Sequence, residues 1–260
     1  MKVWSFKELS EKLSSALGLV GHPVGVTMIE KSDELSDIAY KEQPIKRLSK
    51  QLAVCQLISQ ARYLGRVIAA HTCQLSICRL GADSLGVNVG DYAHVYTGTY
   101  FKDEQAALNM IETTPKFERG KYEAIVVAPL HKIPLRPDVV VVYANAAQIL
   151  RIVNGYLYNK GGRIEFSASG DAGLCADTVV MPMLTGQPHV AIPCNGGRIL
   201  SLPNVTDLAC GIPYMLLNEV IEGIEFTARN VPITYPPLWQ HIDWELRSDA
   251  PIYRFLQQDK

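Results

Sequence analysis

The chain has 260 residues, with 25 Lys and Arg against 26 Asp and Glu, and 48% of its residues are hydrophobic. A net charge this close to zero provides no field that would hold nucleic acid or an acidic membrane surface, so we expect neither as a partner. The length is enough for one large core or two small ones, and the composition excludes a disordered chain.

The first half of the chain predicts one α/β unit, residues 21–136. It is preceded by an amphipathic helix within residues 1–20, which lacks the apolar segment and cleavage site of a signal peptide. In the unit, PVGVTMIE predicts a strand, SKQLAVCQLISQARYLG a helix, and DEQAALNMIETTPKFERGKYEAIVVAP a helix and then a strand. The missing signal peptide predicts a cytoplasmic protein, in which the six cysteines stay reduced.

The second half predicts a similar unit, residues 137–232, followed by a C-terminal extension, residues 233–260. DVVVVYA is typical of a strand covered on both faces. Asn145 is placed to cap the next helix, and Gly161 and Gly162 to end it. RIEFSAS predicts a further strand, and VTDLACGIPYMLLNEVIEGIEFTARNVP a helix followed by a strand, with Cys210 near the helix start.

Two phrases of equal length indicate an internal duplication. GRVIAAHTCQLSIC ends at Cys78, and GRIEFSASGDAGLC ends at Cys175. His94 and His189 give a second anchor at the start of two expected strands, although short matches can arise by chance. We therefore expect an α/β fold of two pseudo-twofold-related units packed as one body, with the Cys78 and Cys175 loops equivalent.

Four cysteines form the predicted metal site: Cys55, Cys78, Cys175 and Cys194. Cys55 lies in a helix, so its side chain would have to extend from that helix toward the other three cysteines. Cys73 is the alternative fourth ligand. Four thiolates suit either a tetrahedral zinc or an iron–sulfur cluster. Because free cysteines are often buried as small hydrophobic residues, thiols scattered through a core are the alternative.

The segment PCNGGR predicts a pocket for an anionic substrate. Arg198 can pair with a carboxylate or phosphate, and Asn195, Gly196 and Gly197 let the backbone approach a ligand. His71 completes the predicted substrate-binding set, and a tight turn with a solvated arginine is the alternative. The sequence contains no G-x-S-x-G, H-E-x-x-H, Walker or G-x-G-x-x-G motif.

The segments CRLGADSLG, SASGDAGLCADTVVMPMLTGQPHVAIPCNGGR and GIPYMLLNEVIEGI resemble the uncharacterised prokaryotic family catalogued as domain of unknown function 169. The resemblance extends from about Leu17 to Ile224. It places Cys78, Cys175 and Cys194 on positions of the family pattern, in which a proline often follows the first cysteine; here Arg79 does. The resemblance implies an origin in anaerobes and archaea, which favours iron over zinc.

These observations predict an iron–sulfur oxidoreductase or lyase of anaerobic metabolism that acts on a small carboxylate between the two halves. Two alternatives stay open: a metal-free enzyme acting on a small carboxylate, and an accessory protein that carries a cofactor for another enzyme. A homo-oligomer is compatible with each of them.

Overall fold

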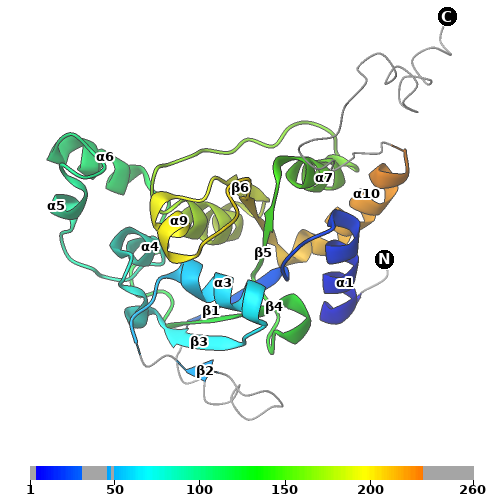
Figure 1. The fold of residues 1–260 in the computed structure, drawn as a ribbon, viewed down its shortest axis with the longest axis horizontal. Helices are drawn as coiled ribbons and strands as arrows, with labels where there is room; N and C mark the ends of the chain where they lie inside the picture. Colours follow the sequence, from blue (N-terminus) through cyan, green and yellow to red (C-terminus); the bar gives the residue numbers. More distant parts are fainter. Residues whose placement is uncertain (1–3, 31–45, 48–49, 231–260) are drawn as a thin grey trace, which may run out of the picture.

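A computed structural model describes residues 4–30, 46–47 and 50–230 (Figure 1). In these residues one seven-stranded sheet has the strand order β2-β3-β4-β1-β5-β7-β6. All neighbouring strands are antiparallel except β2 and β3. The strands are β1 (Val24–Ile29), β2 (Lys46–Arg47), β3 (Ile68–His71), β4 (Ala124–Pro129), β5 (Val139–Ala144), β6 (His189–Ala191) and β7 (Leu208–Pro213).

Helices cover both faces of this sheet, so the fold is mixed α/β. The described α-helices are α1 (Phe6–Leu17), α3 (Val54–Leu64), α4 (Arg79–Ser84), α5 (Ala93–Tyr96), α6 (Glu104–Thr113), α7 (Ala146–Leu157), α8 (Met181–Thr185), α9 (Asn195–Leu200) and α10 (Leu217–Asn230). A π-helix spans Gly173–Val180, and 3-10 helices span Thr72–Leu75, Leu130–Lys132 and Tyr214–Leu216.

The two central strands, β1 and β5, are buried along their whole lengths. Successive side chains of a strand point to opposite faces, so β5 contributes to two cores. Val139 and Val141 belong to a first core with α3 and the π-helix. Val140 and Val142 belong to a second core with α1, α7 and α10. The expectation that this strand is covered on both faces is confirmed.

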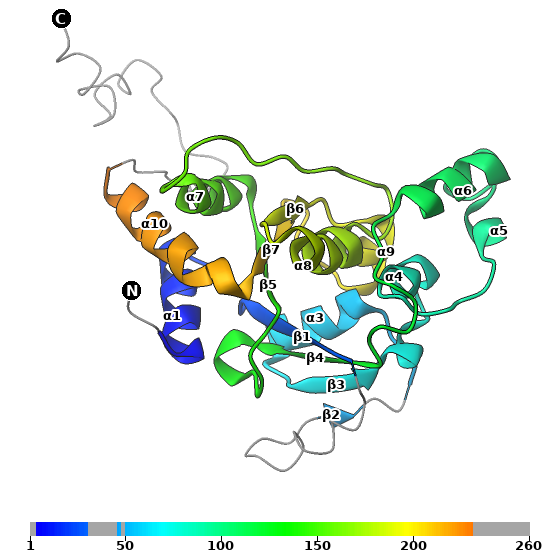
Figure 2. The same cartoon turned by 180° about the vertical axis from the view of Figure 1, so that it is seen from behind.

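Figure 1 and its reverse view in Figure 2 show the helices of the second core, α1, α7 and α10, gathered at one end of the molecule. At the opposite end, α4, α5 and α6 project from the sheet and pack around a smaller apolar cluster. That cluster also includes Ala172 and Ala176. The π-helix segment therefore lies between the first core and the α4–α6 region.

The sheet has β1 and β5 near its middle and β2 at the edge beyond β3. β1 pairs with β5, β4 and β7 flank this pair, and β3 and β6 follow. Residues from both expected units therefore share one continuous sheet.

Several expected elements are confirmed. The N-terminal helix is α1, and the strands expected from PVGVTMIE and DVVVVYA are β1 and β5. Asn145 caps α7, because its Oδ1 accepts a hydrogen bond from the Gln148 N–H at 3.0 Å. The strand expected to begin at His189 is β6. The proposed extension 233–260 lies outside the described residues.

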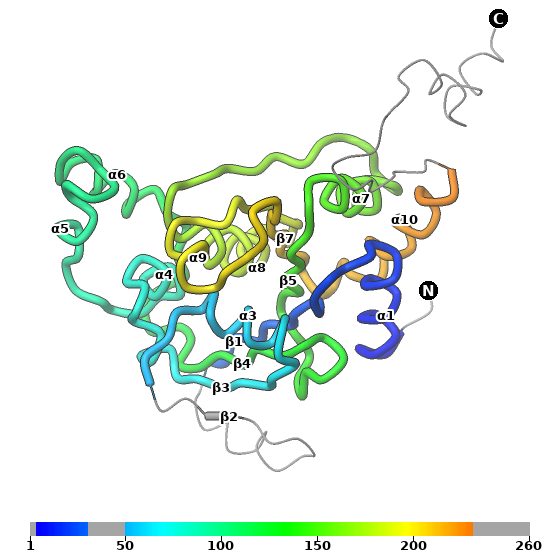
Figure 3. Tube along the Cα trace, viewed as in Figure 1, coloured from blue at the N-terminus to red at the C-terminus, as the bar shows by residue number. Residues whose placement is uncertain are grey.

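Other expectations are wrong. RIEFSAS contains no strand; it belongs to the long connection that Figure 3 shows running from α7 across the molecule. Phe166 in this segment is 54% exposed, and an alternating pattern forms a strand only where a partner strand and a core receive it. His94 lies in α5, not in a strand. In the last segment β7 precedes α10, the reverse of the expected order. No helix in the described ranges is long and apolar enough to cross a lipid bilayer.

Candidate functional site

Cys78 and Cys194 occupy the same position in two short helices. Cys78 is the N-cap of α4, and its Sγ accepts a hydrogen bond from the Gly81 N–H at 3.4 Å. Cys194 is the N-cap of α9, and its Sγ accepts from the Gly197 N–H at 3.3 Å. Backbone N–H groups that donate to sulfur favour the thiolate form. Burial nevertheless raises the pKa of both thiols, so these N–H groups offset only part of the effect of burial.

The glycines three residues after these cysteines leave space for the sulfur atoms. A Cβ at Gly81 would lie 3.0 Å from the Cys175 Sγ and 3.3 Å from the Cys78 Sγ. A Cβ at Gly197 would lie 3.4 Å from the Cys194 Sγ. Because Gly81 touches two sulfurs at once, Cys78 and Cys175 are close neighbours although nearly a hundred residues separate them.

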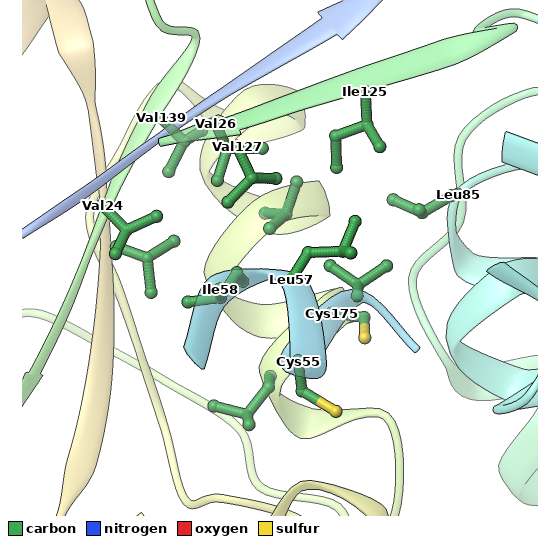
Figure 4. Close-up of a cluster of buried hydrophobic side chains, with 14 of the residues drawn as sticks. Val24, Val26, Cys55, Leu57, Ile58, Leu85, Ile125, Val127, Val139 and Cys175 are labelled. Atoms are coloured by element: carbon green, nitrogen blue, oxygen red, sulfur yellow. The ribbon is translucent and has the colours of Figure 1, made fainter. Parts of the chain in front are cut away.

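Cys175 and Cys55 enter from the first core. Cys175 lies in the π-helix Gly173–Val180, a rare kind of element that often occurs at functional sites. Ala172, before it, is buried with φ +53°, a left-handed conformation that is uncommon outside glycine. Cys55 is the second residue of α3. Figure 4 shows the sulfurs of Cys55 and Cys175 on the side of the core farther from β1 and β4.

Burial is the largest influence on the pKa of each of the four thiols. Burial raises the pKa of Cys55 to about 12, with smaller increases from the charges of Cys194 and Cys78. Burial raises the pKa of Cys78 to about 12, and the charges of Asp171 and Cys194 add to it. The pKa of Cys175 is raised well above its usual value, first by burial and then by the other three thiols. The structure places Cys55, Cys78 and Cys175 around the first core and Cys194 beside Gly173, and their role as ligands stays a prediction.

Their spacing is not that of a single-ion site. Within the part of the chain that the structure describes, no group of three or more His, Cys, Asp or Glu side chains is arranged to hold a metal ion. A zinc ion needs each sulfur at about 2.3 Å, whereas charges interact over several ångströms. The described thiols therefore do not form a preformed single-ion site.

Buried polar side chains surround this thiol cluster. Asp171 is 4% exposed, and its Oδ1 has no hydrogen-bond partner. The pKa of the Tyr96 phenol is raised by burial and then by the charge of Asp171. Tyr92 donates a hydrogen bond to Asp83 at 2.7 Å, and Lys116 forms an ion pair with the same carboxylate. No sequence pattern predicted these groups as part of the site. The only available signal for Asp171 was its place in the glycine-rich segment before Cys175.

Arg198 makes bonds within its own loop. Its Nη1 donates to the Asn204 carbonyl at 2.8 Å, and its Nη2 donates to the Asp207 carbonyl at 3.4 Å. These bonds tie α9 to the turn before β7. The backbone N–H of Asn195 donates to the Gly170 carbonyl at 3.1 Å, which joins α9 to the segment before Asp171.

The other predicted substrate-binding residues differ in their surroundings. Gly196 adjoins Asp171, since a Cβ at Gly196 would lie 3.4 Å from the Asp171 Oδ1. Gly197 adjoins Cys194. His71 is exposed at the end of β3, where its backbone N–H donates to the Gln74 side chain at 3.0 Å.

Two cavities among the described residues have walls without any of these cysteines. One, of about 340 Å³, lies between the start of β5 and α8 and includes Arg136, Asp138 and Tyr214. The other, of about 620 Å³, lies between α1 and α10. Neither includes the segment PCNGGR.

The two remaining cysteines lie elsewhere. Cys210 is in β7 and faces the second core, so its expected position near a helix start is wrong. Cys73 is exposed in the 3-10 helix Thr72–Leu75.

The expected equivalence of the Cys78 and Cys175 loops is also wrong. Residues 65–78 contain β3 and lead to the N-cap of an α-helix, whereas residues 162–175 contain no strand and end inside a π-helix. The matching letters therefore do not mark equivalent elements.

Comparison with known proteins gives the family of the chain. The model of the family described as uncharacterised ArCR, domain of unknown function 169, matches residues 12–223. The chain belongs to this family. Within the family, it is similar to the uncharacterized protein MJ0308 of Methanocaldococcus jannaschii, with 29% identity over 231 residues that cover 86% of this chain and 96% of the relative. No solved structure matches the chain. The family match spans all four clustered cysteines and Asp171.

Proposed function

We propose that Cys55, Cys78, Cys175 and Cys194 hold an iron–sulfur cluster. The observation that carries the proposal is that four separate elements place thiols near one another. A Cβ at Gly81 would lie 3.0 Å from the Cys175 Sγ and 3.3 Å from the Cys78 Sγ, and a Cβ at Gly173 would lie 3.8 Å from the Cys194 Cβ. Cys55 packs in the same core as Cys175. Thiols placed only to fill a core have no need to be neighbours, and Cys210 in the second core is such a case.

The electrostatics support a bound cation. Cys55, Cys175 and Cys194 are buried and Cys78 is half-buried, and burial raises the pKa of all four, so these thiols keep their protons when no metal is present. A metal replaces those protons, and its positive charge removes the repulsion between the sulfurs. The N–H groups that donate to Cys78 and Cys194 are of the kind that tunes iron–sulfur clusters.

We propose a cluster rather than zinc because the resemblance to a family of anaerobes and archaea favours iron. Four thiolates suit either group. Among the described residues no group of three or more His, Cys, Asp or Glu side chains is arranged to hold a metal ion, so the proposal rests on the neighbouring thiols and not on a preformed ion site.

An internal duplication, in a register other than the one expected from the sequence, would explain how the site is built. We pair β1 with β5, and β4 with β7, according to their places in the sheet. β4 and β7 each lead into a 3-10 helix. The first residue of each 3-10 helix donates a backbone hydrogen bond to the residue that precedes β1 or β5. The Leu130 N–H donates to the Pro23 carbonyl at 2.8 Å, before β1. The Tyr214 N–H donates to the Asp138 carbonyl at 2.9 Å, before β5.

In this register the cysteines form two equivalent pairs. Cys78 corresponds to Cys194, because each caps the helix that follows an edge-side strand, β3 or β6, and each accepts a bond from a glycine. Cys55 corresponds to Cys175, because each lies in the first turn of a helix of the first core. A pseudo-twofold axis between β1 and β5 would then bring two ligands from each half to one site.

We assign the protein as a redox or lyase enzyme whose cluster acts on a small carboxylate. Gly196 and Gly197, which were predicted to approach a ligand, adjoin Asp171 and Cys194, so a substrate at the cluster would meet this turn. Arg198 would stabilise the turn through its hydrogen bonds to the Asn204 and Asp207 carbonyls.

Anaerobic purification of the full chain, followed by iron, sulfide and zinc analysis, tests the proposal. We expect a brown protein with iron and sulfide in equal amounts. Replacement of Cys78, Cys175 or Cys194 by Ala should remove most of the iron, because each supplies a ligand. Cys210→Ala is the matched control, since it removes an equally buried thiol from the other core and should leave the iron in place. Iron-free wild-type protein, or equal loss in the control, would refute the cluster.

A further inference from the structure

The cavity between the start of β5 and α8 carries two opposite charges. It has a volume of about 340 Å³, a size typical of small-molecule sites, and its walls include Arg136 and Asp138. Both residues are exposed to solvent, and neither takes part in the salt bridges between described residues. A ligand in the cavity therefore meets a cation and an anion that do not neutralise each other.

Hydrogen bonds hold Asp138 in place at the end of the sheet. Its N–H donates to the Val26 carbonyl at 2.9 Å, and its carbonyl accepts from the Tyr214 N–H at 2.9 Å. Its Oδ2 accepts from the Met28 N–H at 2.7 Å, which leaves the other carboxylate oxygen for a ligand. Partial burial raises the pKa of this carboxyl, and the Met28 N–H and Arg136 lower it. A ligand cation would favour the charged carboxylate further.

Arg136 is oriented by an aromatic ring. Its guanidinium carbon lies 5.3 Å from the centre of the Tyr214 ring, a cation–π contact. The Arg136 carbonyl accepts from the Thr27 hydroxyl at 3.4 Å, so the backbone is attached to β1. A cation–π contact uses the face of the guanidinium and leaves the N–H groups at its edge. Those N–H groups form the planar fork that binds a carboxylate through two hydrogen bonds.

The remaining walls of the cavity are largely apolar. They include two prolines and two methionines, Pro182, Met183, Pro213 and Met215. A proline has no backbone N–H to offer, and a methionine thioether packs favourably against aromatic rings. These walls suit an apolar body with an aromatic ring rather than a third charged group.

We propose that this cavity binds an α-amino acid with an aromatic side chain. Its carboxylate pairs with Arg136, its ammonium pairs with Asp138, and its ring lies among Met183 and Met215. The two protein charges come from residues two apart in the chain, and the two charges of an α-amino acid are likewise close together. This site shares no lining residue with the thiol cluster, so it goes beyond the proposed function.

Calorimetric titration of the full-length wild type with three compounds tests the pairing of charges. The compounds are L-phenylalanine, 3-phenylpropanoate, which lacks the ammonium, and 2-phenylethylamine, which lacks the carboxylate. L-phenylalanine should bind at least about tenfold more tightly than either of the others, because each of those loses one charged hydrogen bond.

Two variants assign the charges. Arg136→Gln should weaken L-phenylalanine and 3-phenylpropanoate at least about tenfold and leave 2-phenylethylamine unchanged. Asp138→Asn should weaken L-phenylalanine and 2-phenylethylamine and leave 3-phenylpropanoate unchanged, while its amide oxygen still accepts from the Met28 N–H. Arg163→Gln is the control, since it removes an exposed arginine outside the cavity and should change none of the affinities.

Three results would overturn the proposal. The first is no binding at about 10 mM L-phenylalanine, where a site with a Kd of about 1 mM would be largely filled. The second is equal affinity of the wild type for all three compounds. The third is an Arg136→Gln protein that binds L-phenylalanine as the wild type does. If Asp138→Asn does not fold, the three compounds and Arg136→Gln still decide. Iron content has no part in the outcome, so failure here leaves the cluster proposal standing.

Discussion

At the residue scale, the thiols give the metal-free protein a distinct pH dependence. Burial raises the pKa of Cys55 and Cys78 from 9.0 to about 12, so the folded protein keeps protons that the unfolded chain releases. The native state then binds more protons than the unfolded state, and stability falls as pH rises from about 9 toward 12.

We therefore predict that the urea midpoint of chelator-treated protein decreases between about pH 8 and pH 11. Cys55→Ala should flatten this decrease, because alanine has no proton to lose. Cys73→Ala is the control, since Cys73 is exposed, and should leave the slope unchanged. An identical slope in Cys55→Ala and wild type would show that burial of this thiol does not govern the titration.

The candidate site was predictable from residue type, not from geometry. The cysteines stood out because few residue types bind metals and because Cys194 precedes glycines. Asp171 did not stand out, since an aspartate in a glycine-rich segment is common in turns. Its burial depends on α5 and α9, which pack around it from distant parts of the sequence.

At the scale of elements, strong local patterns predicted structure correctly. The β-branched run of β5 and the cap at Asn145 both have local causes. The segment 205–232 was assigned in the wrong order because the short apolar run of β7 has no periodicity of its own and continues directly into the helical pattern of α10. Pairing with β5 and β6 fixes it as a strand.

The contact between α7 and α10 gives a prediction at this scale. A Cβ at Gly223 would lie 2.2 Å from the Gly155 carbonyl oxygen, so the two helices can approach closely only because both residues are glycine. Gly223→Ala should push the helices apart and lower the free energy of unfolding by about 1–3 kcal/mol.

Urea unfolding measures this loss, with Glu222→Ala, a neighbouring change in the same helix, as the control that should have little effect. Iron content should be unchanged, because α7 and α10 belong to the second core and the cysteines do not. A Gly223→Ala protein as stable as the wild type would contradict the close helix contact.

At the scale of the whole molecule, the sequence predicted two equivalent α/β halves, and the Cys78 and Cys175 loops are not equivalent. The two phrases were aligned by their positions in the chain, whereas equivalent strands have to be identified by their positions in the sheet. In the proposed register, α5 and α6 lie between α4 and β4 but no helix lies between α9 and β7, so one constant sequence offset would not align the two halves.

The proposed register makes a prediction for an experimental structure. Superposing β1, β3 and β4 on β5, β6 and β7 should bring Cys78 over Cys194. A separation of their Cα atoms by more than one helical turn, about 5.4 Å, would contradict the duplication.

The measurement that tests the central claim most directly is the iron and sulfide content of the full chain purified without oxygen, compared with Cys175→Ala. The charges of all three other thiols contribute to the raised pKa of Cys175. Replacing Cys175 should therefore reduce the iron content more than replacing any one of the others. The account predicts iron and sulfide in the wild type and their near-complete loss in a folded Cys175→Ala protein. A folded wild type that contains neither, and gains neither on anaerobic reconstitution, would contradict it.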